Sequence, residues 1–184
     1  RQMAGFLETT PYVGTLQYCK RELERLEEAF HNSNLNPLVS VVIPFYNRVD
    51  MTLNAVKSVL AQTYKNTEII LVNDCSSVDL RRIKDFTNRH KNIKLITLDK
   101  NSGPAAARNV GIRKAGGDYI AFLDSDDLYD QNKLERQINE MARYNPNISY
   151  TPYIRRRDGV QDEYVGDPSL SGIVVPQIVR GCSI

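Results

Sequence analysis

Three carboxylates follow directly on an apolar run, and their position is the strongest chemical signal in the sequence. The run Tyr-Ile-Ala-Phe-Leu leads into Asp124, Ser125, Asp126 and Asp127. Such a run is typical of a buried parallel strand, and open α/β sheets bind ligands just beyond the carboxyl ends of their strands. Mg²⁺ and Mn²⁺ prefer carboxylate oxygens, often together with a substrate's phosphates. The acids are therefore a candidate metal and diphosphate site, although aspartate also caps helices, which stays an open alternative.

Polar side chains also follow the first and second expected strands, at the same predicted edge of the sheet. Pro44 ends the first strand, Tyr46 offers a flat face for a base, and Asn47 offers an amide for hydrogen bonding. Asp74 follows the second strand and can accept a hydrogen bond from a ribose hydroxyl or a base N–H. The alternative for Asp74 is a helix N-cap, a role that nearby serines and Asp79 could fill equally well.

The helix expected after the third strand begins with small residues and carries an arginine in its first turns. Gly103 precedes this helix, and three alanines before Arg108 let a ligand or another backbone approach closely. A cation near a helix N-terminus opposes the helix dipole, so Arg108 should have a partner elsewhere. A diphosphate would supply one, and so would an ion pair with Asp124 or Asp126. The sequence leaves both open.

Strand and helix patterns alternate along the central part of the chain and would position these residues. The expected strands are 38–43, 68–72, 93–98 and 119–123, and the expected helices are 50–61, 78–89, 104–114 and 131–144. This alternation predicts right-handed crossovers and a mostly parallel sheet covered by helices on both faces. The absence of a Gly-rich dinucleotide fingerprint and of a phosphate loop with its lysine argues against dehydrogenases and nucleoside triphosphatases.

The two ends of the chain differ from this central pattern. Apolar residues at helical spacing among charges predict an amphipathic helix over Thr15–Phe30. We therefore expect residues 1–36 to be a helical extension with a linker, and residues 37–184 to be the main domain. Beyond Pro146 the pattern weakens: we expect a strand over 148–154, a loop over 155–172 with Arg155–Arg157 as a solvated turn, and a strand or short helix over 173–179.

Composition and charge limit the possible classes of protein. The chain has 184 residues, of which 41% are hydrophobic and 25% charged, as in ordinary globular domains. The net charge of +2 is too small to indicate nucleic acid binding. Three widely spaced cysteines indicate neither a disulfide framework nor a zinc cluster, and so favour a reducing compartment. No apolar stretch is long enough to cross a bilayer. We expect a cytoplasmic protein, at most attached to the inner face of a membrane.

Four sequence motifs, in this order, resemble the nucleotide-sugar domain of family 2 glycosyltransferases, which has the GT-A fold. They are Val-Ser-Val-Val-Ile-Pro-Phe-Tyr-Asn (39–47), Ile-Ile-Leu-Val-Asn-Asp-Cys-Ser (69–76), Gly-Pro-Ala-Ala-Ala-Arg-Asn-Val-Gly (103–111) and Gly-Asp-Tyr-Ile-Ala-Phe-Leu-Asp-Ser-Asp-Asp (117–127). The resemblance covers Leu38 to about Tyr144. It implies a metal-dependent, inverting transfer of a sugar from a nucleotide diphosphate donor, commonly a UDP-sugar, to an acceptor hydroxyl on a glycan, lipid-linked or other acceptor.

By position, the resemblance also implies a role for individual residues of this sequence. Asp74 would contact the base, Arg108 the diphosphate, and Asp126 would ligate Mn²⁺ or Mg²⁺. Asp124 would contact the ribose or the metal's water shell, and Asp127 would support the loop. The full set implied to bind the donor is Pro44, Tyr46, Asn47, Asp74, Gly103, Arg108, Asp124, Ser125 and Asp126.

The general base of the family is an acid in the C-terminal half, often in a Glu-Asp pair, and no such pair follows Tyr144. The resemblance therefore implies that the base lies beyond Ile184 and that the acceptor part is incomplete. A non-catalytic nucleotide-sugar-binding module is one alternative. A nucleotidyltransferase is another, although it would need a Gly-rich loop after the first strand. The donor sugar, the acceptor and the oligomeric state cannot be read from the sequence.

Overall fold

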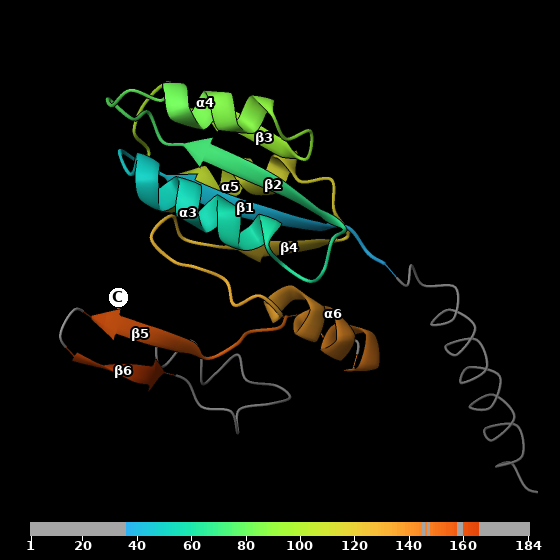
Figure 1. Ribbon diagram of the computed structural model, residues 1–184. Helices are drawn as coiled ribbons and strands as arrows, with labels where there is room; N and C mark the ends of the chain where they lie inside the picture. Colours follow the sequence, from blue (N-terminus) through green and yellow to red (C-terminus); the bar gives the residue numbers. More distant parts are fainter. Residues whose placement is uncertain (1–35, 145, 147, 158–159, 166–184) are drawn as a thin grey trace, which may run out of the picture. The chain divides into compact units, whose positions relative to one another are not determined.

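The computed structural model describes residues 36–144, 146, 148–157 and 160–165 (Figure 1). The described residues divide into two units, with the boundary between Ile138 and Asn139. The elements, in order, are β1 (Val39–Phe45), α3 (Val49–Leu60), β2 (Thr67–Asn73), α4 (Arg81–Asn88), β3 (Ile93–Thr97), α5 (Pro104–Lys114), β4 (Tyr119–Phe122), α6 (Lys133–Tyr144), β5 (Tyr153–Arg157) and β6 (Val160–Val165). The strands and helices expected between Leu38 and Tyr144 are thus present, with shifted ends.

A parallel four-stranded sheet is the centre of the first unit, with the strand order β3-β2-β1-β4. Every pairing in it is parallel, and Val42 of β1 lies opposite both Ile70 of β2 and Phe122 of β4. Helices connect successive strands, so all four strands run in the same direction. The loops that follow β1, β2, β3 and β4 therefore meet at one edge of the sheet, as the sequence predicts.

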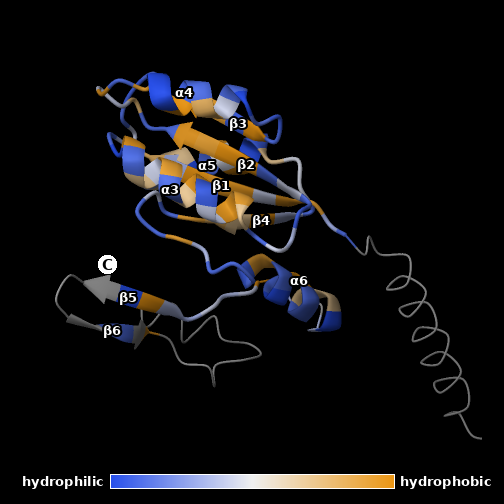
Figure 2. Cartoon of the chain, viewed as in Figure 1, coloured by the Kyte–Doolittle hydropathy of each residue, from blue (hydrophilic) through white to orange (hydrophobic). Residues whose placement is uncertain are grey.

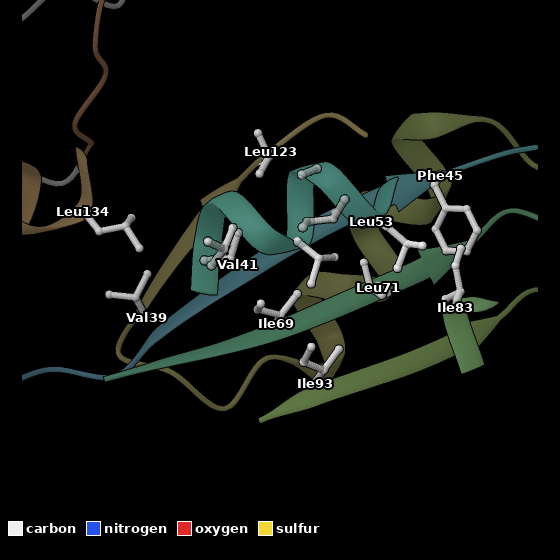
Figure 3. Close-up of a cluster of buried hydrophobic side chains, with 14 of the residues drawn as sticks. Val39, Val41, Phe45, Leu53, Ile69, Leu71, Ile83, Ile93, Leu123 and Leu134 are labelled. Carbon is white, nitrogen blue, oxygen red and sulfur yellow. The ribbon is translucent and has the colours of Figure 1, made fainter. Parts of the chain in front are cut away.

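Alternate residues of the strands pack on opposite faces of this sheet. Val41 and Ile43 of β1 belong to a buried cluster with Leu53 of α3 and Leu134 of α6 (Figure 3). Val42, between them in sequence, instead packs in a second buried cluster that contains residues of β2 and α5. Figure 2 shows the result: β1 and β2 are strongly hydrophobic, whereas the helices show hydrophilic residues outward. The α/β sheet covered on both faces is confirmed.

Helix α5 lies unusually close to the sheet at Gly111. A Cβ atom added there would come within 2.3 Å of Val42 Cγ1, and Val42 is fully buried. A β-branched side chain in a strand has few other rotamers, so it cannot easily move away. Gly111 therefore sets how closely α5 packs on β1, and α5 in turn carries Arg108.

We expect Gly111→Ala to destabilise the fold by about 1–3 kcal/mol, because overpacking outweighs the gain of about 1 kcal/mol that alanine normally brings to a helix. Urea unfolding measures the change. Gly116→Ala is the control, since its nearest neighbour would be Glu68 Oε1 at an ordinary 3.4 Å. The double variant with Val42→Ala should recover part of the loss; a Gly111→Ala chain as stable as the original would show that the sheet accommodates the methyl group.

The first strand is longer than the sequence predicted, since Pro44 was expected to end it. β1 continues through Pro44 to Phe45. The carbonyl of Val42 accepts a hydrogen bond on the β4 side, and Pro44 faces the same side because strand residues alternate in direction. The pairing with β4 ends at Val42 opposite Phe122, so a residue without an N–H loses no ladder bond at Pro44.

In the second unit, β5 and β6 form an antiparallel hairpin. A strand was expected at 148–154, followed by a loop with a solvated turn at Arg155–Arg157. This prediction is wrong, because Arg155–Arg157 lie in β5 and a second strand, β6, follows. Arg155 Nη1 donates to Glu163 Oε2 at 3.1 Å across the hairpin. A sequence signal was available, since Asp-Gly follows these arginines and an Asp-Gly dipeptide between two strand segments is typical of hairpins.

Some expectations lie outside the described residues. These are the amphipathic helix at Thr15–Phe30 and the strand or short helix at 173–179. Helix α4 begins at Arg81 rather than at residue 78, and Asp79 Oδ1 accepts a hydrogen bond from the N–H of Arg81 at 2.9 Å. Within the described ranges, no helix combines the length and the apolar character that a membrane span needs.

A buried carboxylate ties the opposite edge of the sheet together. Glu68 of β2 is only 8% exposed. Its Oε1 accepts from Ser40 Oγ and from the N–H of Gly116, both at 2.6 Å, and its Oε2 accepts from Lys94 Nζ at 2.8 Å. Burial alone would raise the pKa of Glu68, but these hydrogen bonds, with Lys94 first, hold the pKa below its ordinary value of 4.5. The ionised form is thus the one that the fold needs.

We expect Glu68→Gln to destabilise the fold at neutral pH by about 1–3 kcal/mol, because one of its acceptor oxygens becomes a donor facing other donors. Since the folded pKa is lowered, the carboxylate stabilises the fold above pH 4.5, and this contribution is lost as the pH falls through the folded pKa. The difference in unfolding free energy between the two chains should therefore shrink in acid. Asp50→Asn, at an exposed ion pair with Arg82, is the control; a pH-independent difference would contradict the account.

Candidate functional site

The acids after β4 lie on a tight turn at the carboxyl edge of the sheet. The N–H of Leu123 donates to the carbonyl of Val42 at 3.1 Å, and the N–H of Asp127 donates to the carbonyl of Asp124 at 3.0 Å. Ser125 is buried, with 6% exposure, whereas the side chains of Asp124 and Asp126 are 48% and 47% exposed. The turn thus buries the serine and presents the two flanking carboxylates to a ligand.

Asp124 and Asp126 of the turn are each paired with an arginine from another loop or helix. Arg108 of α5 pairs with Asp124, and Arg48 Nη1 lies 2.5 Å from Asp126 Oδ2. The ion pair is the alternative that the sequence analysis left open for Arg108. A guanidinium at this place can also bind a diphosphate, because arginine binds carboxylate and phosphate oxygens with the same planar fork.

Two groups of the turn and its surroundings have raised pKa values. Burial, followed by the charges of Asp126 and Asp124, raises the pKa of Asp127 above its ordinary value. Burial, followed by the charge of Asp124, also raises the pKa of Tyr129, whose hydroxyl donates to the carbonyl of Phe122 at 2.7 Å. Both shifts favour the protonated form of these groups, mainly because of burial and to a smaller extent because of the neighbouring carboxylates.

Asp74, which follows β2, is buried and binds the loop before α5. Its Oδ1 accepts from the N–H of Ser102 and its Oδ2 from the N–H of Gly103, both at 2.8 Å, and it is 4% exposed. Gly103 has a φ of 84°, which favours glycine, so the loop can turn both N–H groups toward the carboxylate. Asp74 therefore positions the loop. Each carboxylate oxygen accepts more than one hydrogen bond, so the capacity to accept a base N–H remains.

Asn47 joins the loops after β1 and β2. Its N–H donates to Ser76 Oγ at 2.9 Å, and its Oδ1 accepts from the N–H of Ser77 at 2.9 Å. Its φ of 57° is a conformation that asparagine tolerates better than most residues. Tyr46, beside it, is 44% exposed and available for stacking. Asn47 thus connects two loops of the protein itself, and these hydrogen bonds fix the backbone next to Tyr46.

The structure brings most of the predicted site residues to one edge of the sheet. Those in the loops, the turn and the first turns of α5 are Tyr46, Asn47, Asp74, Gly103, Arg108, Asp124, Ser125 and Asp126. Pro44 lies in β1, buried, next to this edge. Sequence reasoning assigned no role to Arg48. The signal was available, because Arg48 is a cation at the N-terminus of α3 and, like Arg108, opposes a helix dipole.

The donor set fits a metal that is bound together with a substrate. In the described part of the chain, no group of three or more histidine, cysteine or acidic side chains is arranged to hold an ion. Mg²⁺ and ions like it are usually held by one or two carboxylates plus substrate phosphates and water. Asp124 and Asp126 supply two such carboxylates, which are half exposed and separated by one residue. They suit an ion that arrives with a diphosphate.

The fold and this edge define a class of protein: a parallel α/β domain with carboxylates, arginines and an exposed aromatic side chain at the carboxyl ends of its strands, as in nucleotide-binding domains. The sequence defines it further. The family described as Glycosyl transferase family 2 matches residues 40–171. The chain belongs to this family.

Relatives named as glycosyltransferases agree with this assignment. An uncharacterized glycosyltransferase of Rickettsia bellii (strain RML369-C) is 40% identical over 98% of this chain and 25% of its own length. WfgD of Escherichia coli, a UDP-Glc:alpha-D-GlcNAc-diphosphoundecaprenol beta-1,3-glucosyltransferase, is 37% identical over 80% of this chain and 57% of its own length. The chain therefore spans between a quarter and somewhat more than half of these relatives.

Solved structures share the fold. The crystal structure of S. aureus TarS 1-349 in complex with UDP-GlcNAc superposes with a TM-score of 0.54 and 29% sequence identity. The superposition covers 59% of this chain and 32% of that one. The GT-A fold that the sequence resemblance implied is thereby confirmed.

Proposed function

We propose that this chain is the donor-binding part of a metal-dependent, inverting glycosyltransferase that transfers a sugar from a UDP-sugar to an acceptor hydroxyl in glycan synthesis. The observation that carries the proposal is the turn after β4, where Asp124 and Asp126 are exposed and each pairs with an arginine. Two carboxylates and two guanidinium groups are what a metal-bound diphosphate needs as partners. Membership of the family and the likeness to a UDP-GlcNAc complex support the same donor class.

The uridine would bind at the β1 and β2 loops. Tyr46 would stack on the base, and Asp74 would accept from a base N–H while it keeps its bonds to the loop before α5. Pro44 would contact the uridine beside them. Asn47 would hold these loops together from its position between Ser76 and Ser77.

The diphosphate would bind between α5 and the turn after β4, residues 124–127, which we call the acid turn. Arg108 would turn from Asp124 to the phosphate oxygens, and Gly103 leaves the start of α5 free of a side chain. Asp126 would hold Mn²⁺ or Mg²⁺, with Asp124 on the ribose or the metal's water shell, and Ser125 would support the turn. The metal, when bound, supplies positive charge that stabilises the leaving nucleoside diphosphate.

The acceptor side of the reaction lies in other residues. A general base must deprotonate the acceptor hydroxyl on the face of the sugar opposite the diphosphate, and its proposed place beyond Ile184 stays a prediction. The proposed domain is residues 37–184, with residues 1–36 as an extension. Because WfgD is named for a lipid-linked acceptor, we propose that this protein also acts on such an acceptor, in the cytoplasm at the inner face of a membrane.

Calorimetric titration of UDP into the full chain, with and without Mn²⁺, tests the proposal without a known acceptor. We expect binding that strengthens at least about tenfold with Mn²⁺, since the ion links the carboxylates to the diphosphate. The same titration with GDP tests whether the site distinguishes uridine from guanosine. Absence of UDP binding by a folded sample would refute the donor assignment, whereas binding without sugar transfer by the full-length protein would favour the non-catalytic module.

A further inference from the structure

Arg48 makes a contact that stability does not explain. Its Nη1 donates to Asp126 Oδ2 at 2.5 Å, across 78 positions of sequence. The two side chains are 52% and 47% exposed, and exposed ion pairs contribute little to folding. A cation at the N-terminus of α3 is also disfavoured by the helix dipole. The position of Arg48 is thus costly for α3 and gains little for the fold.

The backbone around Arg48 is held firmly, so the guanidinium is directed at the acid turn. Thr52 donates to the carbonyl of Arg48 from its N–H at 2.9 Å and from its Oγ1 at 2.6 Å. On the other side, Asn47 is bonded to Ser76 and has a left-handed φ. A long side chain that begins at a fixed backbone can change partner by rotation about its own bonds alone.

Charge balance indicates when the partner would change. Asp124 and Asp126 are neutralised by Arg108 and Arg48 in the structure. A divalent cation added alone would compete with these arginines and leave an excess of positive charge. A cation that arrives with a nucleoside diphosphate brings the negative charge that two released guanidinium groups require. Metal and nucleotide binding should therefore be coupled, and Arg48 is placed to couple them.

We propose that Arg48 occupies Asp126 in place of the metal until the donor binds, and then moves to the diphosphate. This inference rests on the proposed function. In the absence of nucleotide Arg48 opposes metal binding, because it competes for the same carboxylate. In its presence Arg48 favours binding, since guanidinium forms charge-assisted hydrogen bonds with phosphate oxygens. Arg48 is thus a binding residue whose change of partner makes the metal and the nucleotide bind together, and the coupling is reciprocal.

Two affinities of the Arg48→Ala chain test this exchange, both measured by calorimetry. Affinity for Mn²⁺ alone should rise about two- to fivefold, because an exposed competitor is removed. Affinity for UDP at saturating Mn²⁺ should fall about tenfold or more, because a charge-assisted contact to the diphosphate is lost. If Arg48 had only a structural role, its removal would not raise the affinity for Mn²⁺ while lowering the affinity for UDP. Arg48→Lys, which keeps the charge without the planar fork, should lie between the two chains.

Matched variants separate the possible outcomes. Arg82→Ala removes a similar exposed arginine, paired with Asp50 at 2.7 Å and outside the acid turn, and should change neither affinity. If Asp126→Ala weakens UDP binding while Arg48→Ala behaves like the unchanged chain, the proposed function stands and the exchange is refuted. Mn²⁺ affinity that is unchanged or lower in Arg48→Ala refutes it as well. If the unchanged chain binds no UDP, both proposals fail.

Discussion

Asp126→Ala should lower the affinity for UDP in the presence of Mn²⁺ by at least about 100-fold, and the remaining binding should no longer respond to the metal. Mutation of a residue that only supports a metal ligand typically lowers metal affinity about 10–100-fold. We expect a larger loss for Asp126→Ala, because Asp126 is itself the proposed ligand. Calorimetry of UDP with and without Mn²⁺ measures it. The free energy of unfolding should fall by less than about 1 kcal/mol, since the ion pair between Asp126 and Arg48 is half exposed.

The control for this variant is Asp50→Ala, which removes another exposed aspartate paired with an arginine. It should bind UDP and Mn²⁺ like the unchanged chain. Asp126→Asn keeps the shape but removes the charge and should resemble the alanine variant. Metal dependence that survives in Asp126→Ala would move the metal to other residues and would overturn the assignment of the turn after β4.

Asp74→Ala should have two large effects, one on stability and one on binding. Its carboxylate accepts from the N–H groups of Ser102 and Gly103 in a place that is 4% exposed. Removal leaves two partly buried N–H donors without their partner, and hydrogen bonds to charged groups contribute about 1.5–3 kcal/mol each. We expect a loss of about 2–4 kcal/mol in urea unfolding. UDP affinity should fall as well, because the base loses its acceptor and the loop before α5 loses its position.

Asp74→Asn separates these two contributions. The amide keeps one acceptor oxygen, so the loop should be partly retained and the loss of stability should be about half that of alanine. Its NH₂ group cannot accept from a base N–H, so UDP affinity should still fall. If a folded Asp74→Asn chain binds UDP normally, Asp74 acts only as a support of the loop, and the proposed contact with the uridine is wrong.

Local pattern was sufficient for the elements of the sheet. The apolar runs around Val41, Ile70 and Ala121 are strands, and the segments between them are helices with ends shifted by a few residues. The runs around Val41 and Ile70 are buried on both faces, which leaves little choice of side chain and a strong signal. The run around Ala121 was expected to be buried as well, but Ile120 and Phe122 in it are 40% and 47% exposed. The four motifs then placed the chain in its family, because their residues follow the strand ends in a fixed order.

Local pattern failed where pairing partners decide the structure. Pro44 was expected to end a strand, but the ladder on its side had already ended at Val42. Arg155 was expected in a solvated turn, but it faces Glu163 across a hairpin. In both cases the conformation depends on which residues lie on the neighbouring strand, and a propensity for one segment carries no such information.

The sequence by itself determined the fold class, the family and the strand ends at which we propose that ligands bind. Only the tertiary structure decided how those ends contact each other: Arg48 with Asp126, Arg108 with Asp124, and Asp74 with the loop before α5. The physical reason is distance along the chain. Burial and backbone geometry act within a few residues and leave a local pattern, whereas the charges and hydrogen bonds of the site join residues 16 to 78 positions apart once the sheet has formed.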